Sequence, residues 1–140
     1  MNNFTIGGKI TDGNFFPVRN GVFLVGLCSG ELAVYIYLVR CADRTTHQCW
    51  PSYENIGKNV HQSRNTVRKH VRSLEEKRLI YTEHTTVTLQ DGTKHNGTLM
   101  YTIRPFEDAW EYYVDKQQEE NDRRALEERQ KAESAPVAPV

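Results

Sequence analysis

The spacing of apolar residues predicts two consecutive helices in the middle of the chain. From Ser63, a suitable N-cap, apolar side chains recur at helical spacing. They are Val67, Val71 and Leu74. Residues 53–60 form a shorter helix that Ser52 can cap, and its apolar edge is Tyr53, Ile56 and Val60. Because residues 60–62 leave only a tight turn between the helices, the two must cross steeply, as in a helix-turn-helix unit.

The polar residues of the second helix gather on the side opposite its apolar stripe. At about 100° per residue, they fall between about 100° and 200° from Val67. They are Asn65, Arg68, Lys69 and Arg72. Cationic groups meet phosphates or guanine edges and an amide can pair with adenine, so this face suits the major groove of duplex DNA. A solvated face is the alternative, because Arg and Lys are common on exposed helices.

After the second helix the chain changes to residues that favour strands. Residues 79–103 are rich in Tyr, Thr, Val, Leu and Ile, and Asp91 with Gly92 is a strong signal for a two-residue hairpin turn. With the turn there, paired residue numbers sum to 183, and Gln90 faces Thr93. A hairpin placed directly after a recognition helix is a wing.

The tip of the predicted wing spans residues 90–97. It carries Lys94, His95 and Asn96 at the place where a neighbouring minor groove or the DNA backbone would lie. An ordinary polar loop is the alternative interpretation of these residues.

Four short strings of the sequence carry a resemblance to a known family. They are Ser-Gly-Glu-Leu-Ala-Val-Tyr at 29–35, Cys-Trp-Pro-Ser at 49–52, Ser-Arg-Asn-Thr-Val at 63–67 and Leu-Glu-Glu-Lys-Arg-Leu-Ile at 74–80. With them, residues 15–104 resemble the winged helix-turn-helix domains of bacterial, mainly Firmicute, mobile elements, including N-terminal domains of plasmid and phage replication initiators. The resemblance implies DNA contacts by Ser63, Arg64, Asn65, Thr66, Arg68 and Lys69. The chain departs from the family at Arg78, where glycine is common, and in its longer, threonine-rich wing.

A long helix is expected ahead of the helix-turn-helix unit, over residues 30–42 with Ser29 as its cap. Its predicted core stripe is Leu32, Tyr35, Ile36, Val39 and Ala42. The aromatic residues Tyr35, Tyr37 and Trp50 are expected to pack in the core rather than to stack on bases. Residues 15–18 and 22–27 are expected to be extended, lying across the core or adding an edge strand.

A last helix is expected over residues 106–133. Its apolar residues Phe106, Trp110, Tyr113 and Val114 are spaced to line one side, and they are expected to dock on the core rather than to form a dimer seam. Residues 134–140 lack bulk to bury and contain two prolines, which predicts a disordered tail. Residues 1–14 are polar and contain glycine, which predicts a flexible arm.

The predicted fold is therefore α+β, a winged helix-turn-helix over residues 15–105 with a three-helix core and a β-hairpin wing, followed by the C-terminal helix. The net charge of zero is split by region. Residues 1–105 hold 13 Lys and Arg against 8 Asp and Glu, whereas residues 106–140 hold 5 against 10. A basic domain attracts a polyanion and an acidic tail repels it, so we expect the tail to point away from DNA.

Other classes of protein find little support in the sequence. Three cysteines without a close pair, no leader and no apolar run of about 18 residues indicate a cytoplasmic protein that is not inserted in a membrane. A zinc site built from Cys41, His47, Cys49 and His61 would lack a compact ligand pair, so no metal is expected. No phosphate-binding loop or nucleophile motif occurs, so the sequence predicts no enzyme, no cofactor and no small-molecule ligand.

The expected function is sequence-specific binding of double-stranded DNA as a homodimer, in replication initiation or transcriptional regulation of a plasmid, phage or integrative element. Phosphate anchoring is expected from Arg64, Arg68, Lys69 and Arg72, hydrogen bonds to bases or backbone from Asn65 and Thr66, and contacts to the flanking groove from Lys94 and His95. The alternative is a winged-helix adaptor that binds protein through Trp110, Tyr113 and Val114.

Overall fold

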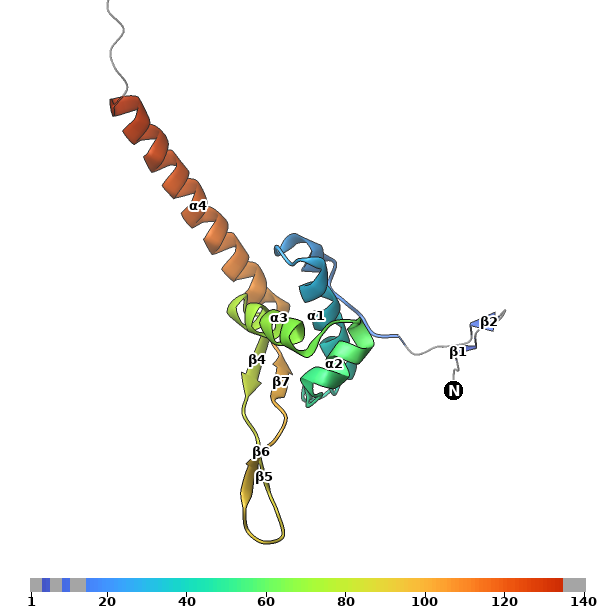
Figure 1. The fold of residues 1–140 in the computed structure, drawn as a ribbon. Helices are drawn as coiled ribbons and strands as arrows, with labels where there is room; N and C mark the ends of the chain where they lie inside the picture. The colour runs from blue at the N-terminus through green and yellow to red at the C-terminus, as the bar shows by residue number, and fades with distance from the viewer. Residues whose placement is uncertain (1–3, 6–8, 11–14, 135–140) are drawn as a thin grey trace, which may run out of the picture.

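The structure of the protein is a computed structural model that describes residues 4–5, 9–10 and 15–134. Its elements in chain order are β1 (Phe4–Thr5), β2 (Lys9–Ile10), η1 (Asn20–Leu24), α1 (Ser29–Cys41), β3 (Gln48–Cys49), α2 (Tyr53–Val60), α3 (Arg64–Glu76), β4 (Ile80–Glu83), β5 (Thr86–Thr88), β6 (Lys94–Asn96), β7 (Met100–Ile103) and α4 (Phe106–Ser134). This is the predicted α+β winged helix-turn-helix (Figure 1). Apart from β1, β2 and Ser134, the arm predicted over 1–14 and the tail predicted over 134–140 fall outside the described residues.

The core lies where α1, α2 and α3 pack against one another and against a three-stranded antiparallel sheet with the order β3-β7-β4. The apolar stripe of α3 is buried as predicted, with Val67, Val71 and Leu74 at most 3% exposed. Tyr101 from β7 is also buried, and Leu79 and Ile80 close the core beneath α3. Burial of one side of α3 leaves its other side facing solvent.

The two central helices begin at the predicted caps. The Ser52 Oγ accepts a hydrogen bond from the backbone N–H of Asn55 at 3.1 Å, and the Ser63 Oγ accepts one from the N–H of Thr66 at 3.2 Å. Each serine thus satisfies a backbone donor that the first helical turn leaves without a partner. The two caps fix where the turn between α2 and α3 begins and ends.

The turn between α2 and α3 depends on a close backbone approach. His61 adopts the left-handed conformation with φ 57°, and the Gln62 N–H donates to the Gly57 carbonyl oxygen at 3.0 Å. A Cβ atom on Gly57 would lie 2.4 Å from the Gln62 carbonyl oxygen, which is closer than side chains come to backbone. Gly57 therefore permits the steep crossing of the two helices.

Helix α1 differs from the prediction at its start and in its core stripe. Its cap is Cys28 rather than Ser29, because the Cys28 Sγ accepts from the Glu31 N–H while the Glu31 carboxylate accepts from the Cys28 N–H. Val34 and Leu38, absent from the predicted stripe, are fully buried, whereas four of the five predicted residues are only half-buried. The helix is apolar on nearly every side, so apolar spacing could not single out its core face.

Two expectations for the rest of the domain are wrong. The segment expected to be extended contains the 3-10 helix η1, which buries Val22, and it adds no edge strand to the sheet, whose edges are β3 and β4. Trp50 is expected in the core but is 51% exposed. The buried side chain at the end of β3 is that of Cys49, and Trp50 follows the strand. Tyr35 is buried as predicted.

The wing keeps the predicted register only at its base. In β4 and β7 the paired numbers sum to 183, as in Ile80 and Ile103, whereas in β5 and β6 they sum to 182. Residues 84–85 therefore lie opposite residues 97–99, which makes a β-bulge, and the Gly97 N–H donates to the Thr85 carbonyl there. Because the register shifts by one residue, the side chains that share a face change along the wing.

The tip of the wing is a three-residue loop, not the predicted two-residue turn. The Gly92 N–H donates to the Leu89 carbonyl, and the Leu89 N–H donates to the Thr93 carbonyl. Leu89, rather than Gln90, thus faces Thr93. Gly92 has φ 85°, and a turn followed by a left-handed glycine is a common geometry of three-residue hairpin loops.

Helix α3 ends in a Schellman motif with an arginine in the position that usually holds glycine. The Leu79 N–H donates to the Leu74 carbonyl at 3.0 Å, the Arg78 N–H donates to the Glu75 carbonyl at 3.1 Å, and Arg78 has φ 61°. The Arg78 guanidinium lies 5.2 Å from the centroid of the Tyr112 ring in α4. This contact offsets part of the backbone strain of a left-handed arginine.

The C-terminal helix docks through its first two turns only. Phe106 and Ala109 are buried and Tyr113 is half-buried, but Trp110 and Val114 are 41% and 46% exposed. The expectation that all four bulky residues dock is therefore wrong for Trp110 and Val114, which lie on the outer side of the helix. Beyond these turns α4 projects from the body, away from the wing (Figure 1).

A buried ion pair holds α1 to the end of α3. Glu31 is 5% exposed, and its carboxylate accepts hydrogen bonds from the Ser73 hydroxyl and from the Lys77 ammonium, whose nitrogen lies 2.9 Å away. Burial by itself would raise the pKa of Glu31. The hydrogen bonds from the Cys28 N–H, Ser73 and Lys77 outweigh burial and lower the pKa to about 2.

We predict that this carboxyl makes the fold sensitive to acid. Its pKa falls from 4.5 to about 2 on folding, so its contribution to stability is complete above pH 4.5 and is lost as the pH falls towards 2. The loss should be roughly 3 kcal/mol in the free energy of unfolding, measured by urea denaturation. Glu31→Gln should be destabilised at pH 7 and should lose less stability between pH 5 and 2; an unchanged acid dependence would contradict this role.

Candidate nucleic-acid interface

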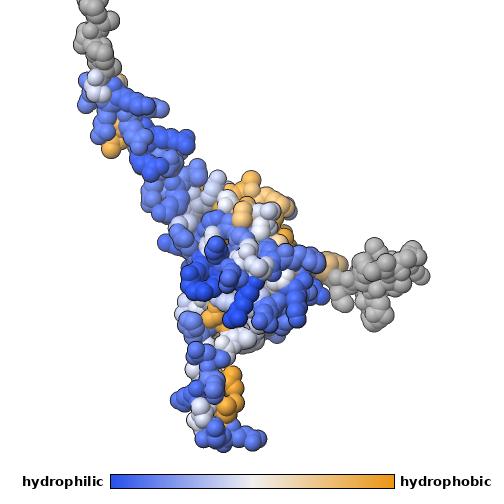
Figure 2. Space-filling model, viewed as in Figure 1, coloured by the Kyte–Doolittle hydropathy of each residue, from blue (hydrophilic) through white to orange (hydrophobic). Residues whose placement is uncertain are grey.

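The outer face of α3 is an exposed cationic surface. The cations on it are Arg64, Arg68, Lys69 and Arg72. All four are exposed, as is Asn65, and none forms an ion pair with a carboxylate within residues 15–134. Figure 2 shows a strongly hydrophilic surface over α3. Because no acid within residues 15–134 pairs with these cations, their charge is available to an external polyanion.

At the start of α3, two residues predicted to contact DNA also form hydrogen bonds that cap the helix. The Ser63 hydroxyl accepts from the Thr66 N–H and donates to the Thr66 Oγ1 at 2.8 Å. Both predicted site residues are thus engaged with each other, and Thr66 is partly buried. Ser63 acts first as a helix cap, and the Thr66 hydroxyl keeps its own proton for an outside acceptor.

The two predicted wing residues, Lys94 and His95, are neighbours in the chain but point to opposite faces of the wing. Lys94 and His95 are consecutive in β6, where neighbouring side chains point to opposite sides of the ribbon. Lys94 pairs with Thr88 and shares the polar face of the wing. His95 pairs with Val87 on the other face, where Val87 and Leu89 are 49% and 46% exposed. A surface that contacts Lys94 head-on would therefore leave His95 pointing away.

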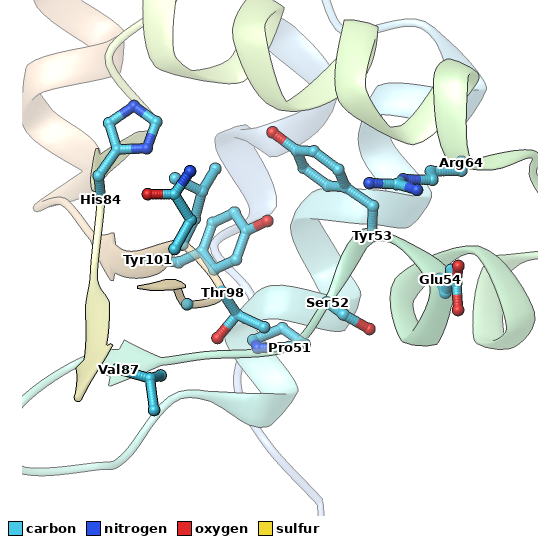
Figure 3. Close-up of a pocket in the computed structure, with 12 residues that line it drawn as sticks. Pro51, Ser52, Tyr53, Glu54, Arg64, His84, Val87, Thr98 and Tyr101 are labelled. Carbon is cyan, nitrogen blue, oxygen red and sulfur yellow. The ribbon is translucent and has the colours of Figure 1, made fainter. Parts of the chain in front are cut away.

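A groove of about 710 Å³ separates the start of α3 from the wing (Figure 3). Arg64 borders it from α3, and the first residues of α2 border it on the same side. The wing supplies the opposite wall, including His84 and Thr98. Lys94 and His95 do not line this groove, since they lie further out along the wing.

The residues of the groove were not predicted as functional from the sequence. In the sequence, Tyr53 belongs to the apolar edge of its helix and Tyr101 to the strand-forming run of the hairpin. Thr98 lies in the bulge at residues 97–99 and lines the groove together with Tyr53. The isolated Gly97 within the strand-forming run was a signal for this bulge. The Tyr and Thr content of the hairpin was a signal that hydroxyl groups would gather there.

Comparison with known sequences assigns the central part of the chain. Residues 25–80 match the family described as Helix-turn-helix domain, a range that contains α1, α2 and α3. The chain carries a helix-turn-helix domain. The cationic helix α3 is the second helix of that unit, the position of a recognition helix.

A solved structure supports the fold of the helix-turn-helix domain and its flanks. The chain is similar to a protein described as a possible transcriptional regulator from Methanosarcina mazei Go1, with a TM-score of 0.51 and 20% sequence identity. The similarity covers 76% of this chain and 80% of that one. At this identity the similarity establishes the fold. No curated protein is significantly similar to the chain.

The described residues contain no cluster of metal-ligating side chains and no helix suited to span a membrane. In the described part of the chain, the structure places no three His, Cys, Asp or Glu side chains where they could hold a metal ion together. None of the helices within the described ranges has both the length and the apolar character needed to span a bilayer. The cysteines Cys28, Cys41 and Cys49 are all free thiols.

We predict that substitutions at Ser63 separate its two roles. Ser63→Ala should lower stability by about 1 kcal/mol, because the cap is lost. Ser63→Asp should keep the cap and the stability, since aspartate accepts the same backbone hydrogen bond. The aspartate should nevertheless weaken DNA binding by repelling phosphate. Thermal denaturation and fluorescence anisotropy with labelled duplex would measure the two effects, and equal DNA binding by Ser63→Asp and the wild type would contradict the proximity of Ser63 to DNA.

Proposed function

We propose that this protein binds double-stranded DNA sequence-specifically by placing α3 in the major groove. The observation that carries the proposal is the outer face of α3, where four exposed cations have no internal acidic partner within residues 15–134. The helix-turn-helix match supports DNA binding in general. A helix of 13 residues is about 20 Å long and about 10 Å wide, which fits a major groove about 12 Å wide.

The residues of α3 have distinct roles in this proposal. The four cations of α3 anchor the domain on phosphates, and those that point into the major groove reach guanine edges. They are Arg64, Arg68, Lys69 and Arg72. Asn65 and Thr66 lie at the start of the helix, from which recognition helices contact base edges. On the wing, Lys94 contacts the flanking backbone, whereas His95 contacts DNA only if the wing enters a groove with both faces covered.

The biological setting we propose is replication initiation or transcriptional regulation of a plasmid, phage or integrative element, in the cytoplasm. The resemblance of residues 15–104 to domains of mobile elements supports this setting. The acidic helix α4 projects away from the wing, so its charge lies far from bound DNA (Figure 1). The protein acts in this role by binding and not by catalysis.

We further propose that the protein binds as a homodimer through an apolar patch at the base of α4. The patch consists of Phe23, Leu24, Trp110 and Val114, which are between 41% and 74% exposed. Leu24 and Trp110 line a common hollow, and Figure 2 shows hydrophobic surface over η1. A second copy would cover both patches at once through a two-fold interface, which suits repeated half-sites in DNA.

The same patch favours a second candidate function, a protein-protein adaptor. A patch of large exposed aromatic and aliphatic side chains is typical of interfaces. In an adaptor the partner would be another protein and the cations of α3 would be incidental. The two functions differ in whether duplex DNA is bound at low salt.

We predict a steep salt dependence of DNA binding. About five phosphate contacts give a slope of log affinity against log salt near −4 to −5. Arg68→Ala should weaken binding by about 1 to 3 kcal/mol and make the slope less steep by about one. Arg129→Ala, an exposed arginine of α4, is the matched control and should bind like the wild type. Anisotropy titrations at several salt concentrations measure this, and the absence of a slope would refute phosphate anchoring.

We predict that Trp110→Ala converts the dimer to a monomer. Light scattering should show a halved mass, and affinity for a two-half-site duplex should fall while affinity for one half-site stays the same. Leu126→Ala, another exposed apolar residue of α4, should leave the dimer intact. A wild-type protein that is monomeric both free and on DNA would contradict the dimer, and self-association without DNA retardation would favour the adaptor.

A further inference from the structure

The groove between α2, α3 and the wing contains hydroxyl groups without internal partners. Tyr101 is 1% exposed, lines the groove and forms no hydrogen bond through its hydroxyl within the described residues. The hydroxyls of Tyr53 and Thr98 likewise line the groove without a partner among those residues. Figure 3 shows these three side chains grouped between the wing and the start of α2. Each of these hydroxyls can therefore donate a hydrogen bond to a molecule that enters the groove.

The chemistry of the groove favours an acceptor-rich, anionic occupant. Tyrosine and threonine hydroxyls can each donate one hydrogen bond, and Arg64 supplies a guanidinium at the rim. Burial, with a smaller contribution from neighbouring Tyr53, raises the pKa of Tyr101, so its hydroxyl keeps the proton that it can donate. A phosphodiester offers only acceptors and matches these donors.

The position of the groove indicates that the phosphate belongs to bound DNA. Arg64 is both the first residue of α3 and part of the groove wall, so the groove is continuous with the cationic face of α3. Its volume of about 710 Å³ lies within the range of sites that enclose small ligands, which is enough for one sugar-phosphate segment. The groove lies between α3 and the wing, the two elements that contact DNA in the proposed complex.

We infer that the groove holds the sugar-phosphate backbone of one DNA strand where it passes from α3 to the wing. Tyr53, Tyr101 and Thr98 donate hydrogen bonds to consecutive phosphate oxygens, and Arg64 provides the charge. The inference rests on the proposed function and extends it, because it assigns DNA contacts to residues outside α3 and the wing tip. It also explains why buried Tyr101 has a hydroxyl at all.

One residue at the rim of the groove is acidic, and it tests whether the occupant of the groove is an anion. Glu54 lines the groove at the start of α2 and is exposed. Beside a phosphate its carboxylate is a like charge, so Glu54→Gln should strengthen duplex binding by about two- to fivefold at low salt. A cationic occupant would give the opposite result.

The decisive experiment uses the full chain and a duplex recovered from a random pool by its binding to the wild type. Single phosphates of this duplex are replaced by neutral methylphosphonates, one position at a time. At one or two adjacent positions the replacement should weaken wild-type binding about tenfold. In the Tyr53→Phe/Tyr101→Phe variant, overall binding should be about tenfold weaker, and the same replacement should cost less than about threefold.

The controls separate the failure of this inference from the failure of the proposed function. Tyr112→Phe removes a hydroxyl outside the groove and should reproduce the wild-type profile. If no duplex is recovered at all, the proposed function fails. If duplex is bound but the double variant keeps wild-type affinity and profile, the groove inference is overturned. Thermal denaturation shows whether the double variant folds. Glu54→Gln tests the groove independently, because unchanged or weaker duplex binding by this variant would overturn the inference.

Discussion

Burial of one side of α3 is the constraint on which the rest of the structure depends. Its apolar stripe must reach the core, so its cations must face outward, and the sharp turn at Gly57 and Gln62 sets the direction in which they point. The ion pair of Glu31 and Lys77 then holds the far end of α3 against α1. The same packing that stabilises the fold therefore presents the surface that we propose for DNA.

Much of this arrangement follows from local chemistry that a sequence displays. Ser52 and Ser63 are strong caps, and the stripe of α3 has clean helical spacing between two polar flanks, so both helices were predicted at their correct starts. Cys28 is a rarer cap than the Ser29 beside it, which explains the error of one residue at α1. The face of α1 that enters the core is decided by what packs on it, and its nearly uniform apolar sequence does not reveal that.

The wing and the groove depend on pairing that local patterns do not determine. Asp91 and Gly92 fit a two-residue turn and a three-residue loop almost equally well, and the bulge at residues 97–99 restores the register that the loop shifts. Tyr53 and Thr98 are 45 positions apart in the chain and line the same groove. Gly97 signals a bulge in the hairpin, but the side chains that this bulge brings to the groove depend on strand pairing, whereas the cationic face of α3 follows from helical spacing alone.

The most direct test of the account is an NMR titration of the full chain, isotope-labelled, with a duplex recovered by selection. We expect the side-chain signals of Arg64, Arg68 and Arg72 and the backbone signals of residues 63–72 to change most, while those of residues 115–134 stay in place. Changes confined to η1 and the exposed side of α4, with α3 unaffected, would contradict it.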